Sequence, residues 1–215
     1  EPWLAMLVAV PYLVVVVAMG YTRQAVAIGI LMAGLAAVTR GASTMRFILY
    51  VAAAALFHKS AVVVLPLVAF ASDRNRLVNV AVALAGTVLL YTLFLERSVD
   101  ALLRNYIVAE YSSQGAMIRV AMSLLPGLLF LALPSLFRFE EGERRLWRNF
   151  AWAAVAMAVA LAVSPSSTAV DRLALYLLPL QVVVLARVPG TLLGRGLGIV
   201  AVVAYALAVQ YVWLN

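Results

Sequence analysis

The segment FILYVAAAALFHKSAVVVLPLVAFA, residues 47–71, decides how this chain can fold, because a polar group interrupts an otherwise apolar run. The interruption, His58-Lys59-Ser60, holds the only His and the only Lys of the sequence. Each apolar half is too short to cross a hydrocarbon core of about 30 Å, which requires roughly 20 helical residues. A charged Lys at mid-membrane costs several kcal/mol unless it faces protein or water. The segment is therefore either one straight span with a polar centre or a hairpin of two short helices.

The composition is that of a polytopic membrane protein. Of the 215 residues, 66% are hydrophobic and 12% are charged, and the mean hydropathy is +1.05. A typical soluble domain has roughly 45–50% apolar and about 25% charged residues. Because Cys is absent, there is no disulfide framework and no thiolate metal site. The sequence begins at Glu1-Pro2 without a Met, so we expect the chain to lack an N-terminal portion.

The excess of positive charge is best explained by the membrane. Sixteen Lys and Arg against nine Asp and Glu give a net charge of +7, and fifteen of the cations are Arg. In a membrane protein this excess indicates cytoplasmic loops and phosphate-binding sites, so we expect no nucleic-acid partner. The planar guanidinium group binds phosphate through two donors at once, although a GC-rich genome would also enrich Arg.

Apolar runs separated by charged connections predict an all-α polytopic membrane bundle with a single transmembrane domain over residues 1–215. The predicted spans are 3–19, 24–39, the broken pair 47–57 and 60–71, 77–95, 117–137, 149–163, 173–186 and 197–214. Within the long connection 96–116, apolar residues at helical spacing predict an amphipathic helix at the membrane surface.

The Arg residues predict which ends of the spans face the cytoplasm. The connection 137–149 holds four Arg, and cytoplasmic connections of membrane proteins are rich in Lys and Arg. If 47–71 is a hairpin, ten of the sixteen cations are cytoplasmic: Arg40, Arg46, Arg74, Arg76, Arg138, Arg144, Arg145, Arg148, Arg187 and Arg195. A straight span would move Arg40 and Arg46 outside. The charge rule therefore favours the hairpin.

In the hairpin arrangement four polar stretches share the external face. They are Tyr21-Thr22-Arg23-Gln24, His58-Lys59-Ser60, the connection 96–119, and Ser164 to Arg172. Polar backbone at membrane depth is tolerated only where it is buried in protein or lines a cavity. We therefore expect the four stretches to line an external-facing polar cavity, surrounded by short and broken helices.

Three ordered motifs resemble those of the EpsG family: GYTRQ at 20–24, LFHKSA at 56–61 and DRLALY at 171–176. The resemblance covers about residues 20 to 190. It implies a Wzy-like glycosyltransferase of the bacterial inner (plasma) membrane, which polymerises polyprenyl-pyrophosphate-linked oligosaccharide repeat units into exopolysaccharide or O-antigen on the periplasmic or outer face. The implied partners are that lipid-linked substrate, membrane lipids and other polysaccharide assembly or export proteins. No cofactor, metal or nucleotide sugar is expected.

Such a reaction needs a base for the acceptor hydroxyl and cations for the leaving pyrophosphate. His58 is the candidate base, because an imidazole accepts a proton near neutral pH, although a lone His is also often structural. Arg172 and Arg23 are candidate pyrophosphate ligands, and Arg23 alternatively anchors its helix at the interface. Asp171 is an alternative base, but Thr168-x-x-Asp171 also fits a capping box.

The remaining candidate substrate contacts are Gln24, Lys59, Arg119, Tyr176 and Tyr111. Lys59 either binds phosphate or extends its ammonium group to the interface. Arg119 lies two residues inside a span and requires an anion or a carboxylate, of which Glu110 is the nearest in sequence. Ser60 is expected to cap the second short helix.

Other functional classes leave weaker signals. No carboxylate pair, metal-ligand cluster or Walker loop fits a glycosidase, a metalloenzyme or an ATPase. The main alternative is a transporter or flippase of lipid-linked sugars or other anionic substrates, because broken helices with polar residues at the midplane are also typical of transporters. A non-catalytic subunit of an export complex is a third interpretation. The absence of a recognisable inverted repeat in the sequence favours the polymerase.

Overall fold

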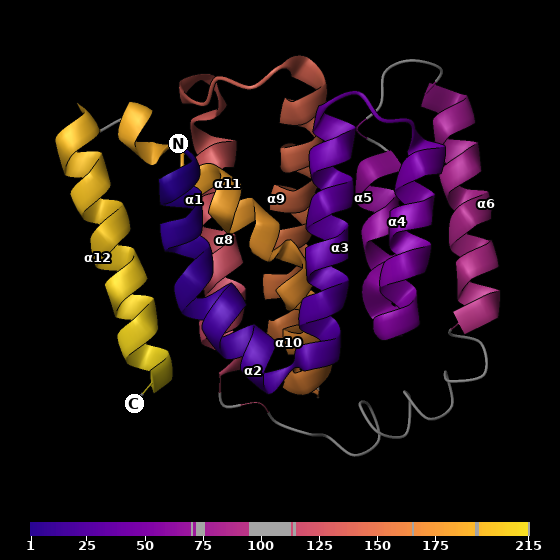
Figure 1. Ribbon diagram of the computed structural model, residues 1–215, viewed down its shortest axis with the longest axis horizontal. Helices are drawn as coiled ribbons and strands as arrows, with labels where there is room; N and C mark the ends of the chain where they lie inside the picture. Colours follow the sequence, from indigo (N-terminus) through magenta and orange to yellow (C-terminus); the bar gives the residue numbers. More distant parts are fainter. Residues whose placement is uncertain are drawn as a thin grey trace.

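A computed structural model shows a bundle of helices that pack side by side and alternate in direction (Figure 1). The structure describes residues 1–69, 71, 76–94, 113, 115–164, 166–191 and 194–214. These described residues contain no strand, because a bilayer offers backbone groups no partner and helices satisfy their own hydrogen bonds. The predicted all-α membrane fold is confirmed.

The helices are labelled here as in Figure 1. The first half of the chain forms α1 (Pro2–Ala9), the π-helical η1 (Val10–Val17), α2 (Ala18–Gly20), α3 (Thr22–Thr39), α4 (Thr44–Phe57), the 3-10 helix η2 (Lys59–Val64), α5 (Leu65–Ala69) and α6 (Arg76–Phe94). The second half forms α8 (Ala116–Ala132), η5 (Pro134–Leu136), α9 (Glu141–Val163), α10 (Ser167–Ala174), η6 (Leu175–Leu177), α11 (Leu178–Leu185), η7 (Val188–Gly190) and α12 (Gly194–Leu214).

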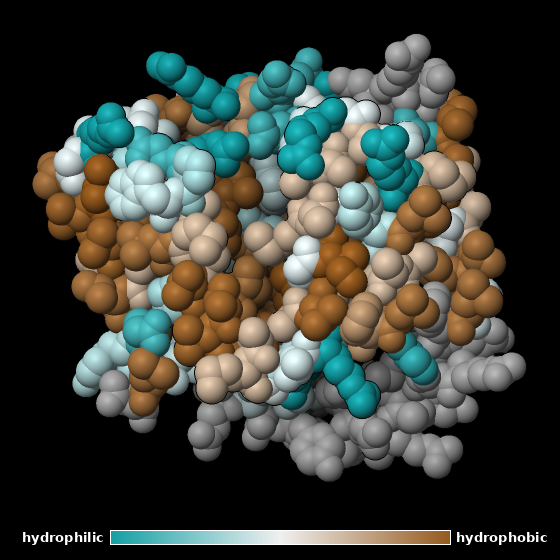
Figure 2. All heavy atoms as spheres, viewed as in Figure 1, coloured by the Kyte–Doolittle hydropathy of each residue, from teal (hydrophilic) through white to brown (hydrophobic). Residues whose placement is uncertain are grey.

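Five described segments are long and apolar enough to cross a membrane, namely Pro2–Gly20, Thr22–Thr39, Glu141–Val163, Ser167–Gly190 and Gly194–Leu214. The shorter apolar helices are Thr44–Phe57, Lys59–Ala69, Leu77–Leu93 and Ala116–Ala132. Figure 2 shows apolar side chains across the middle of one face of the molecule, with many polar side chains above them and a few below them. This distribution is the one that a bilayer imposes on a spanning protein.

The chain folds back on itself at His58. α4 ends at Phe57, and His58 has an extended backbone with φ −146° and ψ 109° before η2 begins. α5 packs against both α4 and α6, and Figure 1 shows α4 and α5 side by side. One straight helix could not return α5 to α4. Residues 47–71 therefore adopt the hairpin alternative.

The hairpin brings three of the sequence motifs to one end of the bundle, called here the motif end. In Figure 1, α3 and α10 begin, and α4 ends, at the lower side of the view. The turn between α3 and α4 and the start of α9 lie at the upper side, called here the arginine end because it carries Arg40 and Arg138 through Arg148. Gly41, with φ +89°, makes the turn after α3 possible.

Close helix packing replaces the hydrophobic effect as the cohesive force, since lipid is as apolar as the core. The largest fully buried side chains include Tyr12, Phe47, Phe130, Phe150 and Leu178, which join η1, α4, α8, α9 and α11. α3 and α4 touch at Gly34, where an added Cβ would lie 2.8 Å from the Cβ of Tyr50. The core therefore fixes the helices that carry the motifs.

Three helix boundaries differ from the predicted ones by five residues or more. α9 begins at Glu141 rather than at 149, because its acidic first turn stabilises the helix N-terminus and Glu141 pairs with Arg145 at 3.0 Å. α10 begins at Ser167, so the polar sequence before residue 173 is helical rather than a connection. α8 ends at Ala132 instead of 137, just before Pro134, which lacks an N–H donor.

Candidate active site at the motif end

His58 joins the α4–η2 turn to the helix that carries the third motif. Its Nδ1 lies 2.8 Å from the Oγ of Ser60 and 2.8 Å from the Oη of Tyr176, and the two hydroxyl oxygens are 3.3 Å apart. Tyr176 is buried in η6, whereas the His58 side chain is half-buried. The prediction that Ser60 caps the second helix is wrong. Ser60 lies inside η2, and its hydroxyl contacts the imidazole instead.

The surroundings of His58 favour its neutral form. Burial, and secondarily the positive charge of Arg172, lower the pKa of His58 from its ordinary value of about 6.5. The imidazole is therefore uncharged at neutral pH. Since Nδ1 is engaged by two hydroxyls, Nε2 is the nitrogen that can meet a substrate.

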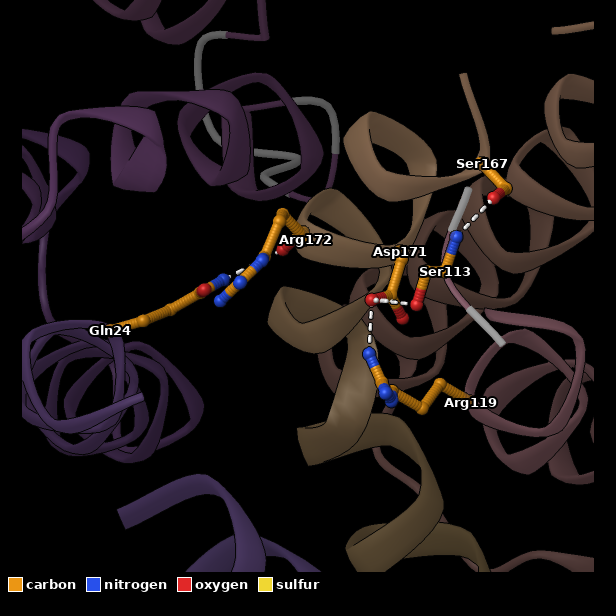
Figure 3. Close-up of polar contacts among 6 residues, drawn as sticks. All are labelled: Gln24, Ser113, Arg119, Ser167, Asp171 and Arg172. Carbon is orange, nitrogen blue, oxygen red and sulfur yellow. Dashed lines mark hydrogen bonds and ion pairs between the residues drawn. The ribbon is translucent and has the colours of Figure 1, made fainter. Parts of the chain in front are cut away.

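Arg172 is held from the first turn of α3. The Nε2 of Gln24 donates a hydrogen bond of 2.6 Å to the carbonyl oxygen of Arg172, and Figure 3 shows the two residues facing each other. The Cζ of Arg172 lies 4.0 Å from the centroid of the Tyr21 ring. Gln24 is buried and Arg23 is exposed, because successive helical residues point about 100° apart. No contact among the described residues links Arg23 to His58 or Arg172.

Arg119 and Asp171 form a buried ion pair between α8 and α10. The two residues are 7% and 1% exposed, so both charges are removed from solvent. The Oγ of Ser113 donates to the same Asp171 oxygen at 3.1 Å, and the Ser113 N–H donates to the Oγ of Ser167 at 2.7 Å (Figure 3). The pair thus ties α8 to α10, and Ser113 is hydrogen-bonded to α10 at both Ser167 and Asp171.

The predicted capping box at Thr168 is wrong. Ser166 is the N-cap residue of α10, and the carboxylate of Asp171 is directed to Arg119 and Ser113 rather than to helix N–H groups. Polar residues of this helix face the protein interior, where such partners are available. Glu110, the carboxylate nearest to Arg119 in the sequence, lies outside the described residues.

Tyr21 is a member of the site that the sequence did not single out. Its ring contacts two guanidinium groups, with the Cζ of Arg172 at 4.0 Å and that of Arg119 at 5.8 Å from its centroid. Arg119 also lies 4.8 Å from the ring centroid of Trp213, near the end of α12. The place of Tyr21 in the GYTRQ motif was the only available signal. Nothing local connects residue 21 with residue 172.

The predicted site residues thus divide into three groups. His58, Tyr176, Arg172 and Gln24 come together, and the Arg119–Asp171 pair adjoins them through Tyr21. Arg23 and Lys59 are exposed at the same end of the bundle. Tyr111 lies outside the described residues, as does the predicted amphipathic helix of the 96–116 connection.

The motif residues are packed against one another, and an open cavity lies elsewhere. It measures about 970 Å³ and opens at the arginine end, where it is lined by residues of the α3–α4 turn, α5, α6 and the start of α9. Neither His58 nor Arg172 borders it. The charged residues of its lining are Arg40, Glu140 and Glu143, and none of them belongs to the three sequence motifs, whose polar contacts lie at the motif end.

Among the described residues, no three His, Cys, Asp or Glu side chains are grouped to hold a metal ion.

Comparison with known proteins identifies one family. The family model described as "EpsG family" matches residues 2–215, nearly the whole chain. Neither a curated protein nor a solved structure matches the chain. The match confirms the resemblance carried by the three motifs, and the chain belongs to the EpsG family.

Proposed function

We propose that the chain is an oligosaccharide repeat-unit polymerase. It joins polyprenyl-pyrophosphate-linked oligosaccharides into exopolysaccharide or O-antigen as a membrane glycosyltransferase. The observation that carries this proposal is the hydrogen bond between His58 and Tyr176, which follows Arg172 by four residues, so that the imidazole and the cation share one end of a membrane bundle. Membership of the EpsG family supports the reaction class.

His58 acts as the general base. Its Nε2 accepts the proton of a sugar hydroxyl on the acceptor oligosaccharide, while that oxygen attacks the anomeric carbon of the donor. The new C–O bond forms as the bond from the anomeric carbon to the pyrophosphate oxygen breaks, and its electron pair leaves with the pyrophosphate. The Nδ1–H of the resulting imidazolium donates to the hydroxyls of Tyr176 and Ser60, and the proton then passes to solvent.

Arg172 stabilises the departing pyrophosphate. A guanidinium group offers two parallel donors to phosphate oxygens and is effectively always charged. Arg23 and Lys59, exposed at the same end, add positive charge that attracts the anionic lipid head. Arg119 is already neutralised by Asp171, so we assign this pair to holding α8 and α10 in register. The same contact occupies Asp171, which leaves His58 as the base.

The site faces the periplasm or the cell exterior in this proposal. The opposite end of the bundle carries Arg40, Arg138, Arg144, Arg145, Arg148 and Arg187. Such an accumulation marks the cytoplasmic side of a plasma-membrane protein. The lipid-linked oligosaccharide then reaches the motif end from the outer leaflet, where other polysaccharide assembly or export proteins receive the product.

Reconstitution tests the proposal directly. The full chain is placed in liposomes with a polyprenyl-pyrophosphate-linked oligosaccharide, and products are separated by gel electrophoresis. We expect a ladder whose rate of formation falls roughly 10²–10⁴-fold in His58→Ala. Arg172→Ala is expected to be similarly impaired, whereas Arg138→Ala, at the opposite end, remains active. Wild-type rates in both site variants would overturn the proposal, and lipid movement without new glycosidic bonds would identify a flippase.

A further inference from the structure

Arg172 is only useful to a pyrophosphate if its guanidinium group is held in place. A free Arg side chain has many rotamers, and fixing it costs entropy that weakens binding. The Nε of Arg172 is buried without a hydrogen-bond partner, and the residue as a whole is half-buried. Something other than a hydrogen bond at Nε must therefore orient this side chain.

Within the described part of the chain, no ion pair orients the side chain of Arg172. The neighbouring carboxylate, Asp171, is committed to Arg119 and to the hydroxyl of Ser113. Arg119 is consequently neutralised, while Arg172 has no ion-pair partner among the described residues. The guanidinium of Arg172 instead lies over the ring of Tyr21, 4.0 Å from its centroid.

We propose that Tyr21 is the positioning residue for Arg172, an inference that rests on the proposed function. A guanidinium stacked on an aromatic face is held by its charge, while its N–H donors remain directed outward in their own plane. The ring of Tyr21 thus presents Arg172 to the pyrophosphate without consuming a donor. The ring is required for this role, and the phenol hydroxyl is not.

The backbone around Tyr21 suits this role. Tyr21 separates α2 from α3 with φ −135° and ψ 50°, outside the helical region, and so directs its ring differently from either helix. One turn later, Gln24 donates to the carbonyl oxygen of Arg172. A single turn of the chain therefore contacts both the side chain and the main chain of Arg172.

A binding experiment with matched variants tests the inference. The full chain in lipid nanodiscs is titrated with polyprenyl diphosphate, the leaving group of the proposed reaction, and Kd is measured. Tyr21→Phe is expected to bind like wild type, and Tyr21→Leu roughly tenfold more weakly. In an Arg172→Ala background, Tyr21→Leu is expected to cause no further loss, because Tyr21 acts through Arg172.

The controls separate positioning from general damage. Tyr50→Leu removes another half-buried ring of the α3–α4 region and is expected to leave Kd unchanged. If Tyr21→Leu does not fold, Tyr21→Met, which also lacks a ring, replaces it. Three outcomes would each overturn the role of Tyr21. The ring-free variant could bind with wild-type affinity, or Tyr21→Phe and Tyr21→Leu could lose equal affinity. Tyr21→Leu could also cause its full loss of affinity in the Arg172→Ala background.

The same experiment distinguishes this inference from the proposed function. If Arg172→Ala weakens binding and Tyr21→Leu does not, only the inference about Tyr21 fails. If Arg172→Ala itself binds polyprenyl diphosphate like wild type, the pyrophosphate-binding role of Arg172 fails, and the role of Tyr21 fails with it.

Discussion

At the scale of single residues, the charge state of His58 determines the pH dependence of the proposed reaction. Burial and the cation of Arg172 lower the pKa of His58, so the neutral base persists to a pH below the ordinary imidazole value of about 6.5. The rate of polymerisation is therefore expected to fall only when the pH drops below that value. A pH–rate profile measures this acid limb, and a midpoint above about 6.5 would contradict the assignment.

Changing the charge at residue 172 tests the cause of this shift. Arg172→Gln removes one of the two effects that lower the pKa of His58, so the acid limb is expected to move to higher pH. Arg172→Lys keeps the positive charge, and its acid limb is expected to stay near that of wild type. Both profiles are recorded as relative rates. Identical limbs in the Gln and Lys variants would show that the charge of residue 172 does not act on His58.

The hydroxyl of Tyr176 offers a second residue-scale prediction. Tyr176→Phe removes a hydrogen bond to the Nδ1 of His58, and we expect kcat to fall about tenfold while KM changes little. Tyr205→Phe is the matched control, since its hydroxyl bonds Gln181 at 3.0 Å away from the site. The kcat and KM of both variants are measured to test this expectation. An equal effect of the two substitutions would count against an orienting role for Tyr176.

At the scale of the helices, the Arg119–Asp171 pair couples α8 to α10. Removing one partner leaves the other as a buried unpaired charge, which typically costs about 3–5 kcal/mol. Arg119→Met and Asp171→Leu are therefore each expected to lower the thermal unfolding midpoint strongly. The double variant is expected to recover most of that loss. Additive losses in the double variant, measured under the same detergent conditions, would contradict this coupling.

Helix α10 also shows where prediction from the sequence reaches its limit. Long apolar runs predicted most helices of the bundle, because the bilayer requires them. The sequence predicts a connection up to residue 172, since a polar run near a span end normally faces solvent, whereas α10 begins at Ser167. Its polar side chains instead face protein partners far away in the chain, such as Arg119, 52 residues from Asp171. Such long-range contacts leave no periodic trace, so the motifs were predictable and their mutual contacts were not.

At the scale of the whole molecule, the distribution of charge predicts its orientation. Because the arginine end is expected to face the cytoplasm, residue 59 is expected to be reachable from outside the cell and residue 138 is not. Both native side chains are exposed. Because the sequence contains no Cys, single Lys59→Cys and Arg138→Cys variants are labelled only at the introduced thiol. Intact cells are treated with a membrane-impermeant maleimide. Labelling at residue 138 alone would show that the protein has the opposite orientation.

The reversal of the chain at His58 also bears on which side of the bilayer residues 1 and 214 lie. A folded-back 47–71 segment adds no net crossing of the bilayer, whereas a straight one would add one crossing. Glu1 pairs with Arg195 at the start of α12 at 3.1 Å, and the 21 residues of that helix carry Leu214 about 30 Å away. Residues 1 and 214 are therefore expected to lie on opposite sides of the bilayer. A fluorescent reporter that matures only in the cytoplasm would give a signal at one of them and stay dark at the other.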